Sequence, residues 1–156
     1  NMERIMIAGK EINELVNSYC KLRDRQYAVY HKCARQNNLS TNELFVLDIL
    51  WFAKNGTTQK EICERLSANK QTIASIVNKG YVEYFEVKED RRNKLIKFTE
   101  SGLKYAKQII PPAANAENLA MANLGIENIK QLVKLTTCFA ENMEIEFDKI
   151  SNKKEK

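Results

Sequence analysis

The sequence is poor in the residues that metal sites and disulfide frameworks require. Its 156 residues include four cysteines and a single histidine. No two cysteines have the C-x2-C spacing of structural zinc sites, so we expect no metal. No export signal is visible, which predicts reduced thiols and a cytoplasmic location. No apolar run approaches the roughly 20 residues that a membrane span needs, so no membrane partner is expected.

The residue sets that catalysis requires are missing as well. We find no Gly-rich phosphate loop and no nucleophile with a suitably placed base. Cys33 and His31 are formally available as a pair, but residues two apart on a helix do not face each other. The sequence therefore predicts a protein that is not an enzyme and uses no cofactor.

With two prolines and five glycines, the chain has few breaks and is predicted to be mostly helical. Apolar residues spaced by three and four over 12–33 predict a long first helix. Capping boxes of the form S/T-x-x-E at 40–43 and 58–61 predict the starts of two further helices. Asn69 is a suitable cap for the next helix. Two short helices joined by about three residues make a helix-turn-helix.

The apolar period changes after this motif. Val82–Val87 and 95–98 are typical of strands, and the charged run 88–94 between them predicts a two-stranded hairpin with a polar tip. Residues 58–110 carry 11 basic and 7 acidic groups, so the positive charge gathers here. A helix-turn-helix followed by a basic hairpin is the winged-helix arrangement, and its charge favours a polyanionic partner.

Long amphipathic helices are predicted on both sides of this motif. Thr99 is expected to cap a helix that Pro111 and Pro112 must kink or break. A last helix from about Ile126 has an apolar stripe with no obvious partner. Burial of the stripes against a second copy is the simplest solution, and packing within one monomer is the alternative. The predicted organisation is an N-terminal helix in the dimerisation region (1–36), a winged helix-turn-helix DNA-binding domain (37–100) and C-terminal dimerisation helices (101–156).

These elements, in this order, resemble the MarR (multiple antibiotic resistance regulator) family of transcription factors. The segments that carry the resemblance are Thr58–Leu66, Asn69–Ile73, Lys79–Val82, Asp90–Ile96 and Phe98–Gly102. The Asp-Arg-Arg wing, followed at a fixed distance by Phe-Thr-x-x-Gly, is its most specific part. The resemblance implies a homodimeric winged-helix repressor that binds double-stranded DNA at an inverted-repeat operator.

One departure from the family concerns the recognition helix. Family members usually have about one more helical turn between its Thr-Ile pair and the Lys-Gly that opens the wing. Here Val77–Gly80 closes that distance. Either the helix is shorter in this protein, or residues near Asn78 are missing from the sequence. We favour the second explanation, because a lost turn is expected to pull the wing against the helix.

Polar and basic side chains of the winged helix suit base edges and phosphates. The resemblance implies that Asp90 orients either Arg91 or Arg92 in the minor groove, where the negative potential is enhanced. As alternatives, Asn69 and Thr72 serve only as helix caps, and the two arginines form a solvated turn. The candidate DNA-binding residues are Thr58, Gln59, Asn69, Lys70, Gln71, Thr72, Ser75, Lys88, Asp90, Arg91, Arg92 and Lys94.

Three hypotheses concern regulation and partners. The resemblance implies a small aromatic effector, with Tyr27, Tyr30, His31 and Trp51 as candidate ligand-binding residues, although aromatics at helical spacing are commonly core. A thiol-based redox sensor using Cys20 or Cys33 is the first alternative. A winged-helix protein-interaction module that does not read DNA is the second, and the Arg91-Arg92 wing argues against it.

Overall fold

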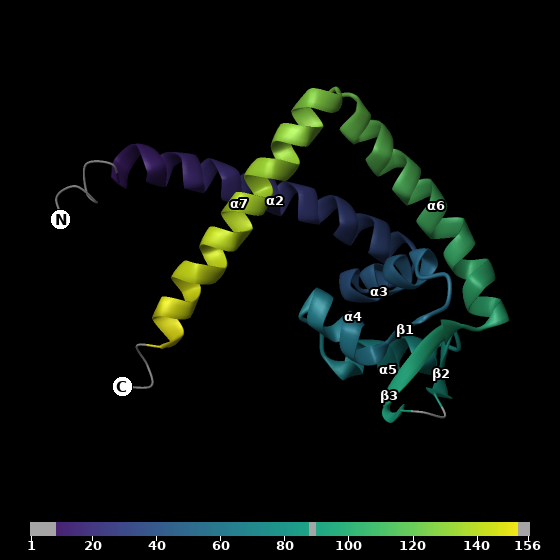
Figure 1. The fold of residues 1–156 in the computed structure, drawn as a ribbon. Helices are drawn as coiled ribbons and strands as arrows, with labels where there is room; N and C mark the ends of the chain where they lie inside the picture. The colour runs from purple at the N-terminus through teal and green to yellow at the C-terminus, as the bar shows by residue number, and fades with distance from the viewer. Residues whose placement is uncertain (1–8, 88–89, 153–156) are drawn as a thin grey trace. The chain divides into compact units, whose positions relative to one another are not determined.

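The computed structural model describes residues 9–87 and 90–152, with the side chains of 90–93 left out of the description. Its elements confirm the predicted class, mostly α with a small β-hairpin wing (Figure 1). The chain divides into two compact units, one ending at Ile110 and the other beginning at Pro111. The elements are α2 (Gly9–Gln36), α3 (Thr41–Phe52), β1 (Thr57–Thr58), α4 (Gln59–Leu66), α5 (Lys70–Asn78), β2 (Val82–Val87), β3 (Asp90–Phe98), α6 (Glu100–Ala122) and α7 (Ile126–Ser151).

Both predicted capping boxes are present. The Ser40 hydroxyl accepts a hydrogen bond from the Glu43 N–H at 3.1 Å, and the Glu43 carboxylate accepts one from the Ser40 N–H at 3.0 Å. Thr58 and Glu61 repeat this arrangement at 3.1 and 3.0 Å. Hydrogen bonds from the Thr57 hydroxyl and the Thr58 N–H lower the pKa of Glu61. The two boxes satisfy N–H groups that helices α3 and α4 leave open at their first turns.

The core of the first unit lies where α3, α4 and α5 meet the sheet. Leu47 of α3 is completely buried, and so are Ile62 of α4 and Ile73 and Ile76 of α5. Ile96 of β3 is buried with them. Figure 1 shows these three short helices gathered beside the strands. Each helix therefore contributes one apolar face to a shared core, which holds the helix-turn-helix together.

The sheet has three antiparallel strands in the order β1-β3-β2. The hairpin β2–β3 is the predicted wing, with Tyr84 opposite Ile96 and a bulge between Phe85 and Val87. The short strand β1 was not predicted, because two threonines before a helix carry no alternating pattern. Thr58 serves in both elements, since its extended backbone pairs with β3 and its hydroxyl caps α4.

The chain between α5 and the wing closes in a regular turn. The N–H of Gly80 bonds the Val77 carbonyl at 2.9 Å, and the N–H of Tyr81 bonds the Ile76 carbonyl at 3.2 Å. Gly80 has a φ of +78°, so this is a Schellman motif that ends α5. The nine-residue helix thus reaches the wing without strain. The structure does not require the missing residues that we favoured near Asn78.

Of the kink or break expected at Pro111-Pro112, the break is wrong, and the kink stays a prediction. Helix α6 is continuous from Glu100 to Ala122, with both prolines inside it. The φ that the proline ring fixes is close to the helical value, so the prolines remove two N–H donors without forcing another backbone conformation. The division into compact units nevertheless falls at this pair. Within the described residues, none of the helices combines the length and apolar character of a membrane span.

A glycine in the first turn of α6 makes a close backbone contact. A Cβ at Gly102 would stand 1.7 Å from the Tyr81 carbonyl oxygen, whereas one at Gly9 of α2 meets nothing within 4 Å. Gly102→Ala must displace Tyr81 or α6, so we expect it to lower the free energy of unfolding by about 1–3 kcal/mol. Gly9→Ala is the matched control and should change it by less than about 0.5 kcal/mol. Urea unfolding at fixed protein concentration measures both, and equal effects would contradict the contact.

Candidate nucleic-acid interface

The N-terminal half of α5 presents polar side chains to solvent. Asn69, Lys70 and Gln71 are exposed, whereas Ile73 and Ile76 on the opposite face are buried. The Asn69 side chain accepts a hydrogen bond from the Thr72 N–H at 3.2 Å and so caps the helix. The exposed face of α5 therefore has the small polar character that base edges in a major groove require.

An open hollow of about 770 Å³ joins the helix-turn-helix to the wing. Four predicted residues line it together: Gln59, Asn69, Lys70 and Lys94. Lys60 also lines it, and the sequence analysis missed this residue. Its position in the first turn of α4, beside Gln59, is the signal that could have indicated it. Three lysines and one carboxylate, that of Glu64, thus border the hollow and give it a net positive charge.

The wing holds two of its lysines over aromatic rings. Lys94 Nζ lies 5.2 Å from the centre of the Tyr84 ring, and Lys97 Nζ lies 5.0 Å from that of Phe85. Both rings are exposed, and they lie on opposite faces of the strand because the two residues are consecutive. Each cation is thereby held on the wing by an attraction to the face of an aromatic ring. Lys88 and the side chains of Asp90, Arg91 and Arg92 lie outside the described residues.

The remaining predicted DNA-binding residues have partners inside the protein. Ser75 points to Glu43, with its hydroxyl 3.4 Å from the carboxylate. The Thr72 hydroxyl lies 3.4 Å from the Asn69 side chain. Thr58 is the cap of α4. These internal contacts are sufficient to explain why polar side chains occur at these three positions.

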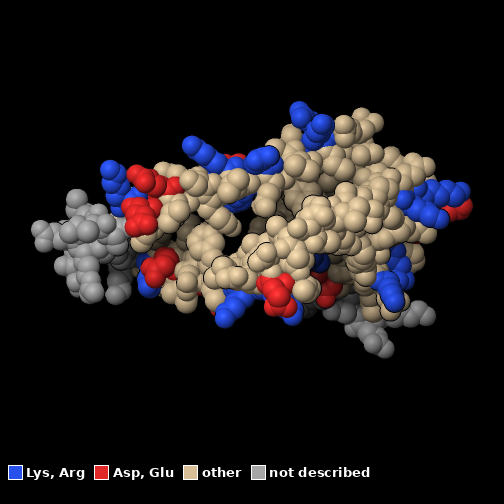
Figure 2. Space-filling view, turned by 90° about the horizontal axis from the view of Figure 1, so that it is seen from above, with Lys and Arg blue, Asp and Glu red and all other residues tan. Residues whose placement is uncertain are grey.

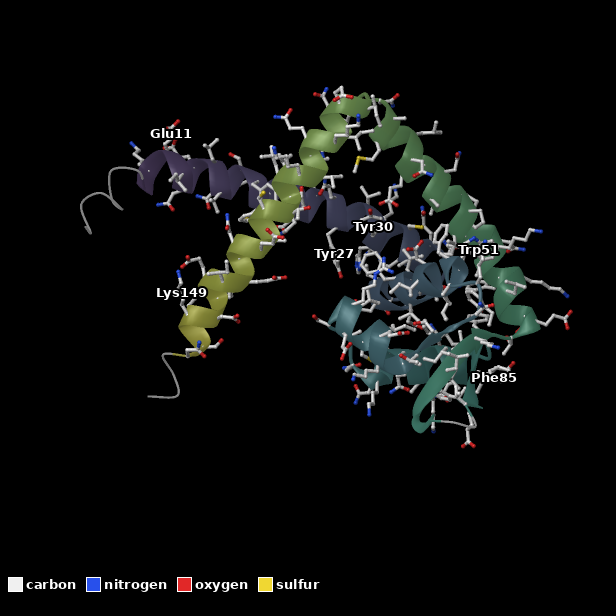
Figure 3. All side chains as sticks on the ribbon, viewed as in Figure 1. Glu11, Tyr27, Tyr30, Trp51, Phe85 and Lys149 are labelled. Atoms are coloured by element: carbon white, nitrogen blue, oxygen red, sulfur yellow. The ribbon has the colours of Figure 1, made fainter. Side chains whose placement is uncertain are left out.

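The predicted effector residues separate into two groups. Tyr27 and Tyr30 lie edge-on to Phe45, with ring centres 6.2 and 5.3 Å away, and His31 Nδ1 is 2.9 Å from the Thr41 hydroxyl. These contacts join α2 to the first half of α3. Figure 3 shows Trp51 apart from the two tyrosines. The sequence alone did not show that Trp51 lies apart from the tyrosines. Trp51 follows Phe45 by six residues and so lies at the far end of α3.

Trp51 borders a second hollow, of about 320 Å³. Its ring lies 6.5 Å from that of Phe98, in an edge-on arrangement, and Leu103 of α6 is exposed beside them. Lys54 and Lys97 also line the hollow, and no carboxylate does. The arrangement combines a flat apolar wall with two cations, which suits a small planar anion.

The four cysteines are free thiols at different depths. Cys33 and Cys63 are half-buried and pack against the core, Cys20 is half-buried on α2, and Cys138 is exposed on α7. Cys63 also lines the hollow between α4 and the wing. Within the described part of the chain, no group of His, Cys, Asp and Glu side chains could hold a metal ion.

The apolar stripes of the long helices remain exposed. No residue of α7 is buried, and its Val133 and Phe147 are more than half exposed. On α2, Ile12 and Leu15 are also more than half exposed. On the face shown in Figure 2, lysines, arginines and carboxylates are scattered between wide areas of uncharged residues. Each helix thus offers an apolar surface that the described contacts of its own unit do not cover.

The cap of α5 leads to a prediction about stability. Asn69→Ala removes the oxygen that accepts from the Thr72 N–H, so we expect a loss of about 1 kcal/mol in the free energy of unfolding. Asn69→Asp keeps the acceptor and should leave this free energy within about 0.5 kcal/mol of the original. Thermal unfolding followed by circular dichroism measures both. If the two variants lose the same stability, the side chain of Asn69 does not act as a cap.

Comparison with solved structures places this fold among known proteins. The transcription regulator MarR from Oenococcus oeni matches with a TM-score of 0.69 and 17% identity over 81% of this chain and 98% of its own. The S. aureus MepR–DNA complex matches at 0.68 and 16%, over 83% and 97%. A MarR family regulator from Neisseria meningitidis matches at 0.62 and 27%, over 94% and 97%. Neither a family model nor a curated protein matches the sequence. The chain therefore has the winged-helix fold of MarR-family transcriptional regulators.

Proposed function

We propose that this protein is a member of the MarR family and a sequence-specific, double-stranded DNA-binding transcriptional regulator. The observation that carries the proposal is the exposed polar face of α5, next to a lysine-bordered hollow that continues onto the wing. The lysines suit phosphates, and Gln71, which is exposed in the first turn of α5, suits base edges. The MepR structure, which shares this fold, is a complex with DNA.

The regulator binds as a homodimer in this proposal. The apolar stripes of α2 and α7 supply the surface, since they leave large side chains exposed within their own units. A two-fold pair presents two copies of α5 to successive major grooves, about one DNA turn apart. The expected operator is an inverted repeat.

The finer part of the proposal is repression that a small aromatic ligand relieves. The hollow at Trp51 supports it, because Phe98 and Leu103 extend the apolar wall while Lys54 and Lys97 supply charge. A role of Tyr27, Tyr30 and His31 in binding the ligand remains a prediction. These side chains already have contacts within the protein. Redox sensing through Cys20 or Cys33 also remains a prediction, and the half-burial of both thiols gives it no special support.

The first test is selection of binding sites from a random duplex library. We expect enrichment of an inverted repeat with half-sites about one turn apart, because two recognition helices enter the DNA together. Arg91→Ala/Arg92→Ala should weaken binding to every duplex and flatten the dependence of log K on log salt, since phosphate contacts are lost. Gln71→Ala is the matched comparison, and it should relax the preference at one base pair and leave nonspecific binding intact.

Two results would contradict this proposal. Enrichment of no sequence by the unaltered protein would exclude sequence-specific binding, and the winged helix would then be better explained as a protein-interaction module. An unchanged affinity of the double arginine variant would exclude the wing as a DNA contact.

The single tryptophan of the chain reports directly on the second hollow. Titration with benzoate should quench or shift the Trp51 fluorescence in a saturable way, because the ring forms part of the wall. Lys54→Met/Lys97→Met should weaken this response to benzoate at least tenfold, while benzyl alcohol, which has no charge, should bind the two proteins alike. A linear, unsaturated response in both proteins would exclude an anion site at Trp51.

A further inference from the structure

A charged contact anchors the C-terminal end of α5. Lys79, the residue that caps this helix, places its Nζ 2.8 Å from Oε2 of Glu43 and 3.1 Å from the carbonyl oxygen of Asn38. The Glu43 side chain is 8% exposed and that of Lys79 is 36% exposed. The contact joins residues 36 apart in the sequence. It therefore connects the recognition helix directly to the start of α3 and to the loop that follows α2.

The Glu43 carboxylate is fully occupied in this position. One oxygen accepts the N–H of Ser40 in the capping box, and the other accepts from Lys79 and from the Ser75 hydroxyl. Burial raises the pKa of Glu43, but the hydrogen bonds from Lys79 and Ser40 outweigh it and lower the pKa below its usual range. The group is therefore charged at neutral pH. The negative charge at the start of α3 and the positive charge at the end of α5 also match the two helix dipoles.

A second set of contacts secures the residues that follow α5. The Tyr81 ring stacks on that of Tyr105 in α6, with centres 4.3 Å apart and planes 9° from parallel. The Tyr105 hydroxyl donates to the Asn37 carbonyl. The Thr99 hydroxyl donates to the Gly80 carbonyl at 2.6 Å. The loop after α2 thus accepts hydrogen bonds from both Lys79 and Tyr105, on the two sides of this junction.

The length of α5 makes this anchor important for orientation. The helix has nine residues, and Lys70 and Gln71 of its N-terminal half are exposed on the face that would meet DNA. Two buried isoleucines, Ile73 and Ile76, fix its distance from α3, but apolar contacts are not directional. The hydrogen bonds from Lys79 to Glu43 and Asn38, and from Ser75 to Glu43, are directional and restrict the rotation of the helix about its axis.

We propose that the Glu43–Lys79 pair is a positioning element of the interface, which sets the orientation in which α5 reads base edges. This proposal rests on the proposed DNA-binding function. The pair has a small effect on nonspecific affinity, because the Lys79 charge is already paired with Glu43 and lies at the C-terminal end of α5, opposite the end that carries Lys70. It has a large effect on discrimination between sequences, because base readout depends on the helix orientation.

The test compares three variants with one control. Lys79→Met keeps the apolar stem and removes the charge, whereas Lys79→Arg keeps a positive charge. The double variant Glu43→Gln/Lys79→Met replaces the pair with neutral groups. Lys104→Met is the control, because its partner Glu100 is exposed and the pair lies on α6. The measurements are affinity for the selected operator and for a scrambled duplex at one salt concentration, and the exchange of backbone N–H groups of 76–81.

We expect Lys79→Met and the neutral pair to lose about tenfold or more in operator affinity, as for a lost charge-assisted hydrogen bond. Affinity for the scrambled duplex and the salt slope should stay within twofold. Lys79→Arg should recover most of the operator affinity, and Lys104→Met should match the original protein. Exchange at 76–81 should accelerate in Lys79→Met while exchange in α4 is unchanged.

Equal losses for the operator and the scrambled duplex would overturn the proposal, since they would indicate a general loss of folded protein. Unchanged exchange at 76–81 would also overturn it. If the original protein prefers no sequence, the proposed function fails, and the exchange measurement alone decides whether the pair anchors α5. Faster exchange in that case would support the anchor without a role in DNA readout.

Discussion

The arrangement of the first unit depends on how α5 divides its surface. Ile73 and Ile76 are completely buried, whereas Lys70 and Gln71 are exposed. A helix of nine residues has little stability of its own, so most of its helicity must come from this burial. The other features follow from the same requirement: α3 and α4 complete the apolar surface that α5 contacts, and the caps at Asn69 and Gly80 end the helix on both sides.

The sequence predicted the local features of this fold well because they depend on short-range chemistry. Each capping box and the Asn69 cap lie within four residues, and the wing hairpin is one continuous segment, 82–98. The strand β1 escaped prediction because its two residues become a strand only through pairing with β3, nearly 40 residues away. The proline pair was overestimated as a breaker, since local sterics disfavour it in a helix but do not forbid it.

Contacts between residues that are far apart in the sequence could not be predicted, for the same reason. Glu43 was identified only as the partner of Ser40, yet it also binds Lys79 and Ser75. Ser75 was assigned to DNA from its helical position, and only the structure places its hydroxyl beside a buried carboxylate. The hollow at Trp51 likewise needs Phe98 and Leu103, which come from other elements. A helical period indicates which side of a helix a residue occupies, and the packing decides what it meets there.

The Glu43–Lys79 ion pair and the exposed apolar stripes meet different physical requirements. An apolar stripe such as that of α7 gains free energy from any complementary apolar surface, so it suits association between copies, where area matters. An ion pair with one buried partner, such as Glu43, contributes little net stability, because desolvation opposes the attraction, but its hydrogen bonds depend on geometry. In the proposed DNA complex a helix as short as α5 contacts few bases, so a small rotation changes a large share of its readout. This difference explains why a charged contact is placed at the end of α5 and apolar surface on the long helices.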